Sequence, residues 1–397
     1  MNEPAASRST VLIATDSFKD NLSAAEVAHH LASGIRTSGI DLEVVERPVA
    51  DGGEGTLEAL GIDGDESHEI SVRGPLDEPT MARWAVVRGA AFVEIAQAAG
   101  AELLQDADPE AVMRAGTYGV GQLILNALDH GHTNIVLTMG GSCTSDGGAG
   151  MLHALGARIL DAAGDPVPPG GAGLALIDTI DLDHLDSRLA DIEVTVACDV
   201  QSPLFGPDGS ARMFGPQKGA ASRQVELLDQ GLEHWAEVLG RSGVGKHRVQ
   251  SLAACPGAGA SGGLAFGALI LPRASAAPGA DLILDLIGFD QLLDSAAVVV
   301  VGEGRLDRQT LLGKVAAVVV RRARHLGIPV IAVAGEVVLD ARELAELGIE
   351  RAWSVCDLAG SLADSKAHAG VYLERIGALV SQWWLEQDQV REPNTVE

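Results

Sequence analysis

The chain has little positive charge. Its 397 residues include 28 Lys and Arg against 55 Asp and Glu, which gives a formal net charge of −27. Tight binding to a nucleic-acid backbone needs clustered Lys and Arg to release counterions. The charge balance therefore excludes a nucleic-acid reader with a broad basic face, and an anionic substrate is expected only at a locally positive site.

Long apolar runs and paired cysteines are also missing. No stretch approaches the roughly 20 apolar residues that a membrane-spanning helix needs. The four cysteines, Cys143, Cys198, Cys255 and Cys356, are far apart and form no CxxC pair, so neither a zinc site nor a disulfide framework is indicated. The first ten residues are polar, unlike a targeting peptide. We expect a soluble, cytoplasmic protein with no membrane partner.

The length predicts two domains, because single hydrophobic cores stop growing at about 250 to 300 residues. Both ends of the chain alternate strands and helices. A strand-like run at 11–15 precedes Ser23-Ala-Ala-Glu26, a capping-box pattern that predicts a helix ending near residue 39, and a second strand is expected at 42–49. Strand, helix, strand is how a parallel α/β sheet begins. The same alternation returns after residue 295, with expected strands at 297–301, 329–334 and 352–355 and helices at 309–326, 340–347 and up to about 384.

The middle of the chain has a different pattern. Three short strand-like runs at 68–72, 81–87 and 91–96 have little helical signal between them, which favours antiparallel pairing. Helices are expected at 116–129 and 224–239, and strands at 134–139 and 192–198. We therefore predict an α/β protein with a Rossmann-like parallel-sheet domain formed by both chain ends, residues 1–70 and 285–397. A second α/β domain is inserted at 71–284, with the active site in the cleft between the two.

Three loops rich in glycine and acidic residues each follow an expected strand. They are Ala50-Asp-Gly-Gly-Glu-Gly-Thr56, Gly140-Gly-Ser-Cys-Thr-Ser-Asp-Gly-Gly-Ala-Gly150 and Gly302-Glu-Gly-Arg-Leu-Asp-Arg-Gln-Thr310. In open α/β sheets ligands bind at the ends of strands, and glycine lets the backbone approach them. A single loop of this kind would be read as a tight turn, but three that also carry charged residues indicate a binding site.

Two short motifs fail on their context. Gly240-Arg-Ser-Gly-Val-Gly-Lys-His247 is spaced like a Walker A loop, but it has His where Ser or Thr binds magnesium and it follows a helical run. Gly257-Ala-Gly-Ala-Ser-Gly262 matches GxGxxG without a convincing strand before it. The second motif can still hold an anion as a turn before a helix.

Lysine is scarce, and its placement is informative. The five lysines are Lys19, Lys218, Lys246, Lys314 and Lys366. Lys19, Lys218 and Lys314 lie beside loops or within helices that adjoin the expected strand ends. A preference for Arg codons explains why lysines are few, but not why three of them gather there.

Eight segments, in order from residue 14 to residue 314, carry a resemblance to one known family. They are Ala14-Thr-Asp-Ser-Phe-Lys19 with Leu22-Ser-Ala24, Pro48-Val-Ala-Asp-Gly-Gly-Glu-Gly-Thr56, Thr117-Tyr-Gly-Val-Gly121, Gly140 to Met151, Cys198-Asp-Val200, Phe214-Gly-Pro-Gln-Lys-Gly-Ala220, Pro256-Gly-Ala-Gly-Ala260, and Gly302-Glu-Gly-Arg-Leu-Asp307 with Gln309-Thr310 and Gly313-Lys314. In these segments the chain resembles the bacterial glycerate kinases, which transfer phosphate from ATP to glycerate.

The resemblance implies ATP and D-glycerate as small-molecule substrates and Mg²⁺ with ATP as co-substrate. It favours 2-phosphoglycerate as the product, with 3-phosphoglycerate as the alternative. Phosphoryl transfer needs positioning, charge neutralisation and a proton acceptor. Lys19 and Arg305 are the candidate cations for phosphate or carboxylate. Asp16, Asp199 and Glu303 lie at expected strand ends and suit a base or a metal ligand; we predict Asp16 as the base, Asp199 as the metal ligand and a catalytic role for Glu303.

Further candidates fall into two groups. Acidic side chains beside a glycine backbone that a substrate can approach closely suit the hydroxyl groups of a polyol. Backbone amides of glycine-rich loops suit phosphates. The substrate-binding candidates are Ser17, Asp51, Gly52, Gly53, Glu54, Asp307 and Gln309, and the ATP-phosphate candidates are Gly140, Gly141, Ser142, Asp146, Gly147, Gly148, Lys218, Gly257 and Gly259.

Three alternatives stay open. The first is a kinase of another short hydroxy acid or polyol. The second is a non-catalytic metabolite-binding protein, which predicts loss of charged residues from the loops, whereas the loops keep Lys19, Asp199, Glu303, Arg305 and Asp307. The third is an NAD-dependent dehydrogenase, which only the GxGxxG match suggests. Oligomeric state has no signature in the sequence. Since both implied substrates are anions, we also expect a small positive pocket within the negatively charged surface.

Overall fold

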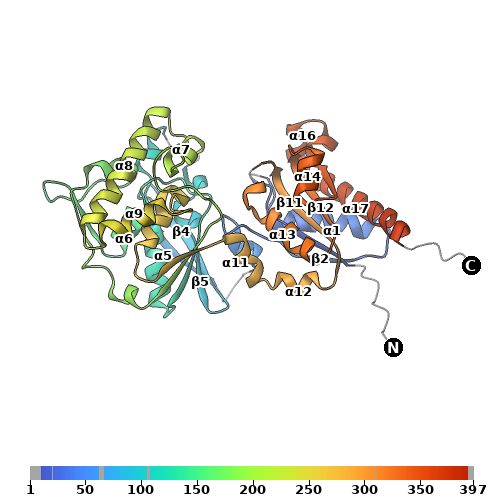
Figure 1. The fold of residues 1–397 in the computed structure, drawn as a ribbon, viewed down its shortest axis with the longest axis horizontal. Coiled ribbons are helices and arrows are strands. Elements are labelled where there is room, and N and C mark those ends of the chain that lie inside the picture. The colour runs from blue at the N-terminus through green and yellow to red at the C-terminus, as the bar shows by residue number, and fades with distance from the viewer. Residues whose placement is uncertain (1–9, 20, 62–66, 105–107, 309, 392–397) are drawn as a thin grey trace, which may run out of the picture. The chain divides into compact units, whose positions relative to one another are not determined.

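The computed structural model describes residues 10–19, 21–61, 67–104, 108–308 and 310–391 and divides the chain into two compact units. The first unit consists of Met1–Asp51, Glu58–Gly61 and Ala280–Glu397, and the second of Gly52–Leu57 and Ile62–Gly279. In Figure 1 the first unit carries both ends of the colour scale, blue at α1 and red at α17. The domain boundaries predicted from the sequence, near residues 70 and 285, refer to independently folding domains, and they stay a prediction.

The first unit contains a five-stranded parallel sheet in the order β13-β12-β11-β1-β2. Numbered within the unit, this is the 2-1-3-4-5 order of doubly wound flavodoxin-like sheets. Helices cover both faces because side chains alternate along each strand. Val11 and Ile13 pack with α1 and α17, whereas Leu12 and Ala14 pack with α11, α12 and α13. The predicted α/β class with a parallel sheet built from both chain ends is confirmed.

The elements of the first unit follow the expected alternation, and the capping box of Ser23 and Glu26 at the start of α1 is present. They are β1 (Thr10–Thr15), α1 (Ala24–Thr37), β2 (Glu43–Glu46), α11 (Gly279–Leu286), α12 (Phe289–Leu293), β11 (Ala296–Leu306), α13 (Val315–His325), β12 (Val330–Val337), α14 (Ala341–Leu347), β13 (Arg351–Ser354), α15 (Val355–Ala359), α16 (Leu362–Ala367) and α17 (Ala369–Arg391). The helix α2 (Thr56–Ala59) contains one of the points where the chain passes between the units.

The strand β11 differs from its prediction. It does not end at residue 301 but continues through Gly302–Leu306, pairing Glu303 with Ala334 and Arg305 with Glu336 of β12. The prediction of a loop here was wrong, because glycine in this run permits close strand approach. A Cβ on Gly302 would lie 2.8 Å from Thr15 Cγ2 and 2.9 Å from the Val333 carbonyl oxygen.

The second unit contains a six-stranded mixed sheet in the order β10-β9-β6-β5-β4-β3. The three strands β3, β4 and β5 pair antiparallel as predicted, and β5, β6, β9 and β10 run parallel. Its elements are β3 (Ser67–Arg73), β4 (Pro79–Val87), β5 (Ala90–Glu94), α3 (Ala96–Ala99), α4 (Ala111–Arg114), α5 (Tyr118–Asp129), β6 (Asn134–Thr138), α6 (Ala149–Ala154), β7 (Arg158–Leu160), β8 (Thr179–Asp181), β9 (Glu193–Ala197), α7 (Ser210–Phe214), α8 (Ser222–Arg241), α9 (Lys246–Ala254), α10 (Leu264–Leu269) and β10 (Ala274–Ala277).

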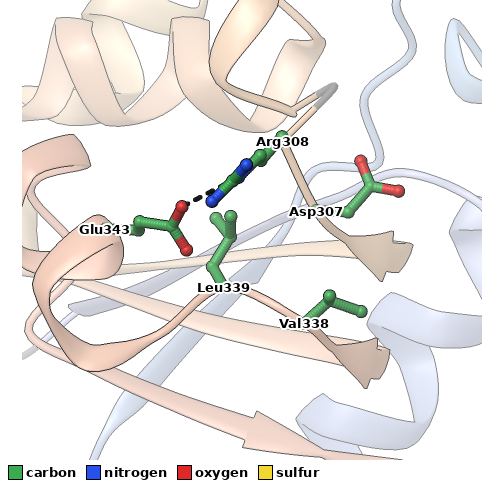
Figure 2. Close-up of a pocket in the computed structure, with 5 residues that line it drawn as sticks. All are labelled: Asp307, Arg308, Val338, Leu339 and Glu343. Carbon is green, nitrogen blue, oxygen red and sulfur yellow. Dashed lines mark hydrogen bonds and ion pairs between the residues drawn. The ribbon is translucent and has the colours of Figure 1, made fainter.

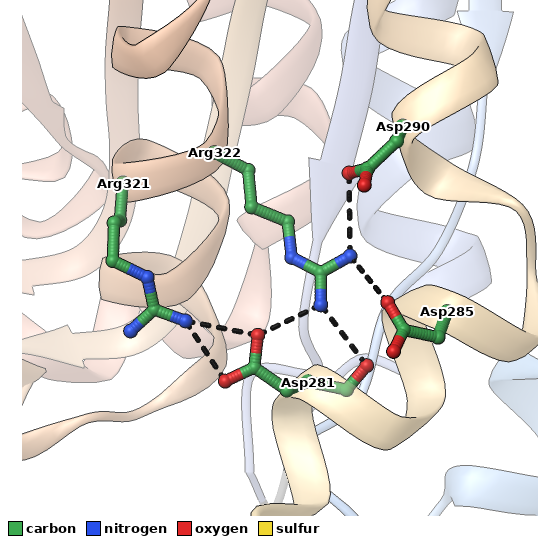
Figure 3. A network of polar contacts seen from close by, with 5 residues as sticks. All are labelled: Asp281, Asp285, Asp290, Arg321 and Arg322. Atoms are coloured by element: carbon green, nitrogen blue, oxygen red, sulfur yellow. Dashed lines mark hydrogen bonds and ion pairs between the residues drawn. The ribbon is translucent and has the colours of Figure 1, made fainter.

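An ion-pair network joins α11 and α12 to α13 in the first unit (Figure 3). The Arg322 side chain is only 14% exposed and contacts Asp281 at 2.7 Å, Asp285 at 2.7 Å and Asp290 at 3.2 Å. Arg321 binds the carboxylate of Asp281 from the other side at 2.8 Å. This network adds polar contacts to two short helices whose apolar residues Ala280, Leu284, Phe289 and Leu293 pack in the core. Across the described residues, no helix combines the length and the apolar character needed to cross a membrane.

Candidate active site

Two acidic residues lie side by side at the carboxyl edge of the first unit's sheet. Asp16 directly follows β1, and its amide donates a hydrogen bond to the carbonyl of Gly302 in the adjacent strand β11 (2.8 Å). Glu303 is the next residue of β11. The order of the sheet changes direction between β1 and β11, and this switch point is where doubly wound sheets bind ligands.

Asp16 has the environment of a proton acceptor that works near neutral pH. Its Oδ1 accepts the Ser17 amide at 2.7 Å. Burial, followed by the negative charge of Asp51, raises the pKa of Asp16 to about 8, against the opposing effects of the Ser17 amide and Lys19. A carboxyl group of this kind can take up a proton during a reaction and release it afterwards.

Glu303 is already bound by two partners in the same unit. It is 5% exposed; one oxygen accepts the Thr310 hydroxyl and the other lies 2.9 Å from Lys314 Nζ. Burial raises the pKa of Glu303, although Lys314 and Thr310 favour the charged form. Burial also opposes the charge on Lys314, but the carboxylate of Glu303, together with Asp307 and Asp51, outweighs burial and raises the pKa of Lys314.

The prediction that Lys314 lies within a helix was wrong, since it is the N-cap of α13. Lys314 and Thr310 were absent from the predicted site, although both stand in the Gln309-Thr310 and Gly313-Lys314 segments. Their contacts with Glu303 depend on the turn between β11 and α13, and the order of residue types along the chain does not reveal the geometry of that turn.

The two predicted cations of this unit are accessible. Lys19 is exposed, and the Arg305 side chain is 59% exposed. The Arg305 guanidinium lies 3.4 Å from Glu336 and 3.7 Å from Asp307. Exposed pairs of this kind are weak, typically about 0 to 1 kcal/mol, so an anionic substrate can replace them. Gln309, also predicted to bind substrate, lies outside the described residues.

A cavity of about 340 Å³ opens beside Asp307, where β11 and β12 end. Figure 2 shows Arg308 reaching toward Glu343 at the start of α14, with Val338 and Leu339 forming the floor. The Arg308 Nε lies 3.0 Å from Glu343 Oε1. The volume falls within the range of small-molecule pockets, about 300 to 1,000 Å³.

The second unit presents a buried carboxylate at the end of β5. Glu94 is 2% exposed and accepts hydrogen bonds from the amides of Gly55 (2.8 Å) and Leu57 (3.3 Å). Burial raises the pKa of Glu94, and the two amides oppose this shift. Glu94 therefore holds the segment Gly52–Leu57 against the sheet. The sequence signal was an acidic residue ending an apolar strand, which is unusual because a buried charge needs partners.

Two of the predicted loops pack directly against each other in the second unit. A Cβ on Gly140 would lie 2.5 Å from Gly53 Cα, and one on Gly141 would lie 2.5 Å from Glu54 Oε2. Gly141 also has φ +63°, a conformation that favours glycine. Gly52 is similarly close to the backbone of Gly279. The structure thus brings Gly52, Gly53 and Glu54 together with Gly140 and Gly141, whereas Asp51 belongs to the first unit.

The remainder of the 140–150 loop is largely buried, and several of its backbone amides have partners within the unit. The Asp146 carboxylate accepts the amides of Thr117 (2.9 Å), Gly148 (3.1 Å) and Gly150 (3.1 Å). The Gly147 amide donates to the Gly262 carbonyl (3.0 Å). Burial raises the pKa of Asp146, and these hydrogen bonds oppose it. The amides of Gly147 and Gly148 are therefore already engaged, which leaves the start of the loop as its accessible part. Ser142, at 8% exposure, lies at the boundary.

Lys218 closes the inner side of this loop. Its Nζ donates to the Thr144 carbonyl at 2.6 Å. Burial lowers the pKa of Lys218 to about 8, with Cys143 and Asp146 opposing. Within the described residues, the buried hydroxyls of Thr144, Ser145 and Ser202 have no hydrogen-bond partner.

The turn that contains Gly257 and Gly259 packs against the segment after β9. The Gly259 amide donates to the Ser202 carbonyl (3.0 Å), and the Ser210 hydroxyl donates to the Gly259 carbonyl (2.7 Å). A Cβ on Gly257 would lie 3.0 Å from Cys198 Sγ. The Walker-like run at 240–247 connects α8 to α9 without a strand, in agreement with its rejection.

Asp199 follows β9 and is half-buried. The strand β9 pairs with β6, and the 140–150 loop follows β6. No group of three or more His, Cys, Asp or Glu side chains in the described ranges is arranged to hold a metal ion.

Comparison with known proteins identifies the family of the chain. The sequence model of the glycerate kinase family matches residues 11–385. The chain is 40% identical to the glycerate 2-kinase of Escherichia coli K12, over 91% of this chain and 94% of that protein. It is 38% identical to the glycerate kinase of Bacillus subtilis 168, over 92% of this chain and 95% of that protein. The crystal structure of a candidate glycerate kinase 2 from Salmonella typhimurium LT2 superimposes with a TM-score of 0.75 at 34% identity, covering 95% of this chain and 99% of that one.

These matches and the doubly wound fold define an ATP-dependent kinase. The chain belongs to the glycerate kinase family, and the resemblance seen in the eight sequence segments is confirmed.

Proposed function

We propose that the protein transfers the γ-phosphate of ATP to the C2 hydroxyl of D-glycerate, producing 2-phosphoglycerate and ADP. The observation that carries the proposal is the half-buried Asp16 at the β1–β11 switch point, whose raised pKa suits a proton acceptor. The relative named glycerate 2-kinase supports the choice of the C2 hydroxyl. Glycerate 3-kinase activity, or activity on another short hydroxy acid, is the alternative.

Asp16 accepts the proton of the attacking hydroxyl as the oxygen forms its bond to the γ-phosphorus. The bond between that phosphorus and the bridging oxygen of ADP breaks in the same displacement. This transition state is loose, and its charge is spread over the phosphoryl oxygens. Lys19 and Arg305 neutralise that charge or bind the glycerate carboxylate, and Ser17, Asp51 and Asp307 orient the substrate.

Glu303 acts differently from a base because both of its oxygens are already bound. Its carboxylate holds the Lys314 ammonium beside the reacting groups, and its charge contributes to the raised pKa of Asp16. Glu303 is therefore a positioning residue in this proposal. Lys314 adds a third cation at the edge of the sheet.

In the second unit, the start of the 140–150 loop supports the ATP phosphates, with Gly140, Gly141 and Ser142 as its accessible part. Gly52, Gly53 and Glu54 lie against that part and contact the substrate hydroxyls. The buried residues Asp146, Gly147, Gly148, Lys218, Gly257 and Gly259 preserve the shape of this loop region. Mg²⁺ neutralises phosphate charge when bound, and Asp199 is the carboxylate proposed to hold it. A cytoplasmic location follows from the use of ATP and is part of the proposal.

The product tests the proposal. The purified protein is incubated with ATP, Mg²⁺ and D-glycerate, and the phosphorylated carbon is identified by ³¹P–¹H correlation. Coupling of phosphorus to the C2 proton is expected. Coupling only to the C3 protons would establish the 3-kinase, and absence of a phosphorylated product from every C3 and C4 hydroxy acid would reject kinase activity.

Charge-removing variants test the cations. Lys19→Ala and Arg305→Ala are each expected to lower kcat/KM for glycerate at least about a hundredfold, the scale of a lost transition-state contact. Arg375→Ala, which removes an exposed arginine of α17, is the control. Near-wild-type kinetics in both folded variants would remove these residues from the site.

A further inference from the structure

A second, smaller cavity lies within the second unit. Its volume is about 100 Å³. Its wall is formed by the end of β3, by the first turns of α5 and α6, and by the segment at 167–177. The function proposed above does not use this cavity.

One side of the cavity is polar and carries a cation. The guanidinium carbon of Arg73 lies 4.2 Å from the centroid of the Tyr118 ring, and His153 meets the same ring edge-on at 5.5 Å. Burial, followed by the charge of Arg73, lowers the pKa of His153, so at neutral pH its imidazole offers a hydrogen bond and no charge. Arg73 has one weak ion pair, to Asp77 at 3.9 Å with both side chains about half exposed. A ligand anion can replace that contact.

The opposite side is apolar. Val167, Pro168, Pro169, Leu174 and Ile177 form it, and the last two are almost completely buried. A pocket with one cationic end and an apolar wall is typical of a site for a small organic anion. The carboxylate would face Arg73 and the carbon chain would lie against the prolines.

The size of the cavity limits the ligand. A dry cavity of about 150 Å³ holds benzene, so one of about 100 Å³ is too small for a purine base. On the same scale it admits a molecule of about four non-hydrogen atoms. Acetate meets this limit, whereas pyruvate and nucleotides do not.

The cavity shares its wall with the glycine loop of the active site. Gly150 lines the cavity, and its amide donates to Asp146 Oδ2 at 3.1 Å. The same oxygen accepts the Thr117 amide at 2.9 Å, while Oδ1 accepts the Gly148 amide at 3.1 Å. A ligand in the cavity therefore rests on backbone that Asp146 ties to the loop. Binding that favours one arrangement of this backbone shifts the population of loop conformations.

We propose that this cavity is a regulatory site for two-carbon carboxylates such as acetate, which bind to Arg73 and alter phosphoryl transfer through the Asp146-held loop. The site goes beyond the proposed kinase function. Binding is measured without turnover, so failure of the proposed kinase function and failure of this inference are distinguishable.

Acetate serves as the probe, with binding to the full-length protein measured by ligand-observed NMR in the absence of ATP and glycerate. Arg73→Ala is expected to weaken binding at least about tenfold through loss of a charge-assisted contact. Val167→Phe is expected to block binding by filling the cavity. Arg241→Ala, at the end of α8, is the charge-matched control and is expected to bind as the wild type does. In the kinase assay, saturating acetate is expected to change kcat or the KM for ATP at least twofold in the wild type and not in Arg73→Ala.

Three results would overturn the inference. The first is absence of probe binding to the wild type. The second is binding that Arg73→Ala and Val167→Phe leave unchanged but that glycerate displaces, which would place the carboxylate at the substrate site. The third is a raised KM for ATP in Val167→Phe without carboxylate binding to the wild type, which would make the cavity part of the nucleotide site.

Discussion

Asp16→Asn is expected to make the protein more stable while it removes catalysis. The pKa of Asp16 is about 8 in the folded protein, against an ordinary value of 3.8. Between these values the unfolded chain has lost its proton and the folded protein still binds one. Folding therefore becomes less favourable as pH rises through this window, by about 1.4 kcal/mol per pH unit for one group. Asparagine keeps the size of the side chain and cannot ionise, so the variant escapes this loss.

The size of the stability difference follows from the pH range between the two pKa values of Asp16. The variant and the wild type should be equally stable below about pH 3, where the Asp16 carboxyl is neutral in both the folded and the unfolded chain. From pH 5 to pH 7 the free energy of unfolding of the variant should gain about 2 to 3 kcal/mol over the wild type, and the gap should level off above about pH 8. For a unit of this size the same gap raises the melting temperature by roughly 5 to 10 °C.

Urea unfolding and calorimetry at pH 5, 6, 7 and 8 measure this gap. Asp41→Asn removes an exposed carboxylate of the same unit and controls for the loss of one negative charge. A gap that stays constant or shrinks between pH 5 and pH 7 would refute the assignment of a raised pKa to Asp16. A stabilised variant that keeps full activity would refute its role as the base.

Three other perturbations have defined outcomes. Asp51→Asn removes the second cause of the raised Asp16 pKa, so the acid limb of kcat/KM should move to lower pH; a limb that stays in place would contradict this. Glu94→Gln leaves one acceptor for two amides and should raise the KM for glycerate about tenfold with little change in melting temperature, as steady-state kinetics and calorimetry would show. Arg322→Ala should lower the free energy of unfolding by about 1 to 3 kcal/mol, as urea titrations would measure, and the loss should be smaller in 1 M salt. Arg321 is more exposed, so Arg321→Ala should lower it by less than half as much in the same titrations.

The sequence predicted those features that depend on local patterns. The capping box at Ser23, the antiparallel run β3-β4-β5 and the parallel strands of the first unit were confirmed because each follows from spacing within a few residues. The family could also be predicted from the sequence, because eight ordered segments are far more specific than one motif.

Other features depend on contacts between distant segments, which local patterns do not contain. The extension of β11 through Glu303 requires glycines that let β1 and β12 come close. Glu94 binds amides nearly forty positions earlier in the chain, so its role was invisible. Gly147 and Gly148 were predicted to bind phosphate together with Gly140 because all three belong to one glycine-rich loop. Their amides instead donate hydrogen bonds to Gly262 and Asp146.

The net charge also has a more specific meaning once the site is described. At the carboxyl edge of the first unit, Lys19, Arg305 and Lys314 alternate with carboxylates such as Asp16 and Glu303. The positive pocket expected from the anionic substrates stays a prediction.

The central claim is that Asp16 accepts the proton during phosphoryl transfer to glycerate. Single-turnover transfer from ATP labelled in its γ-phosphate, measured with saturating D-glycerate and Mg²⁺, tests it most directly. The account predicts that Asp16→Asn folds and binds both substrates but transfers phosphate about a hundredfold to ten-thousandfold more slowly than the wild type. Transfer at the wild-type rate by the folded variant would contradict it.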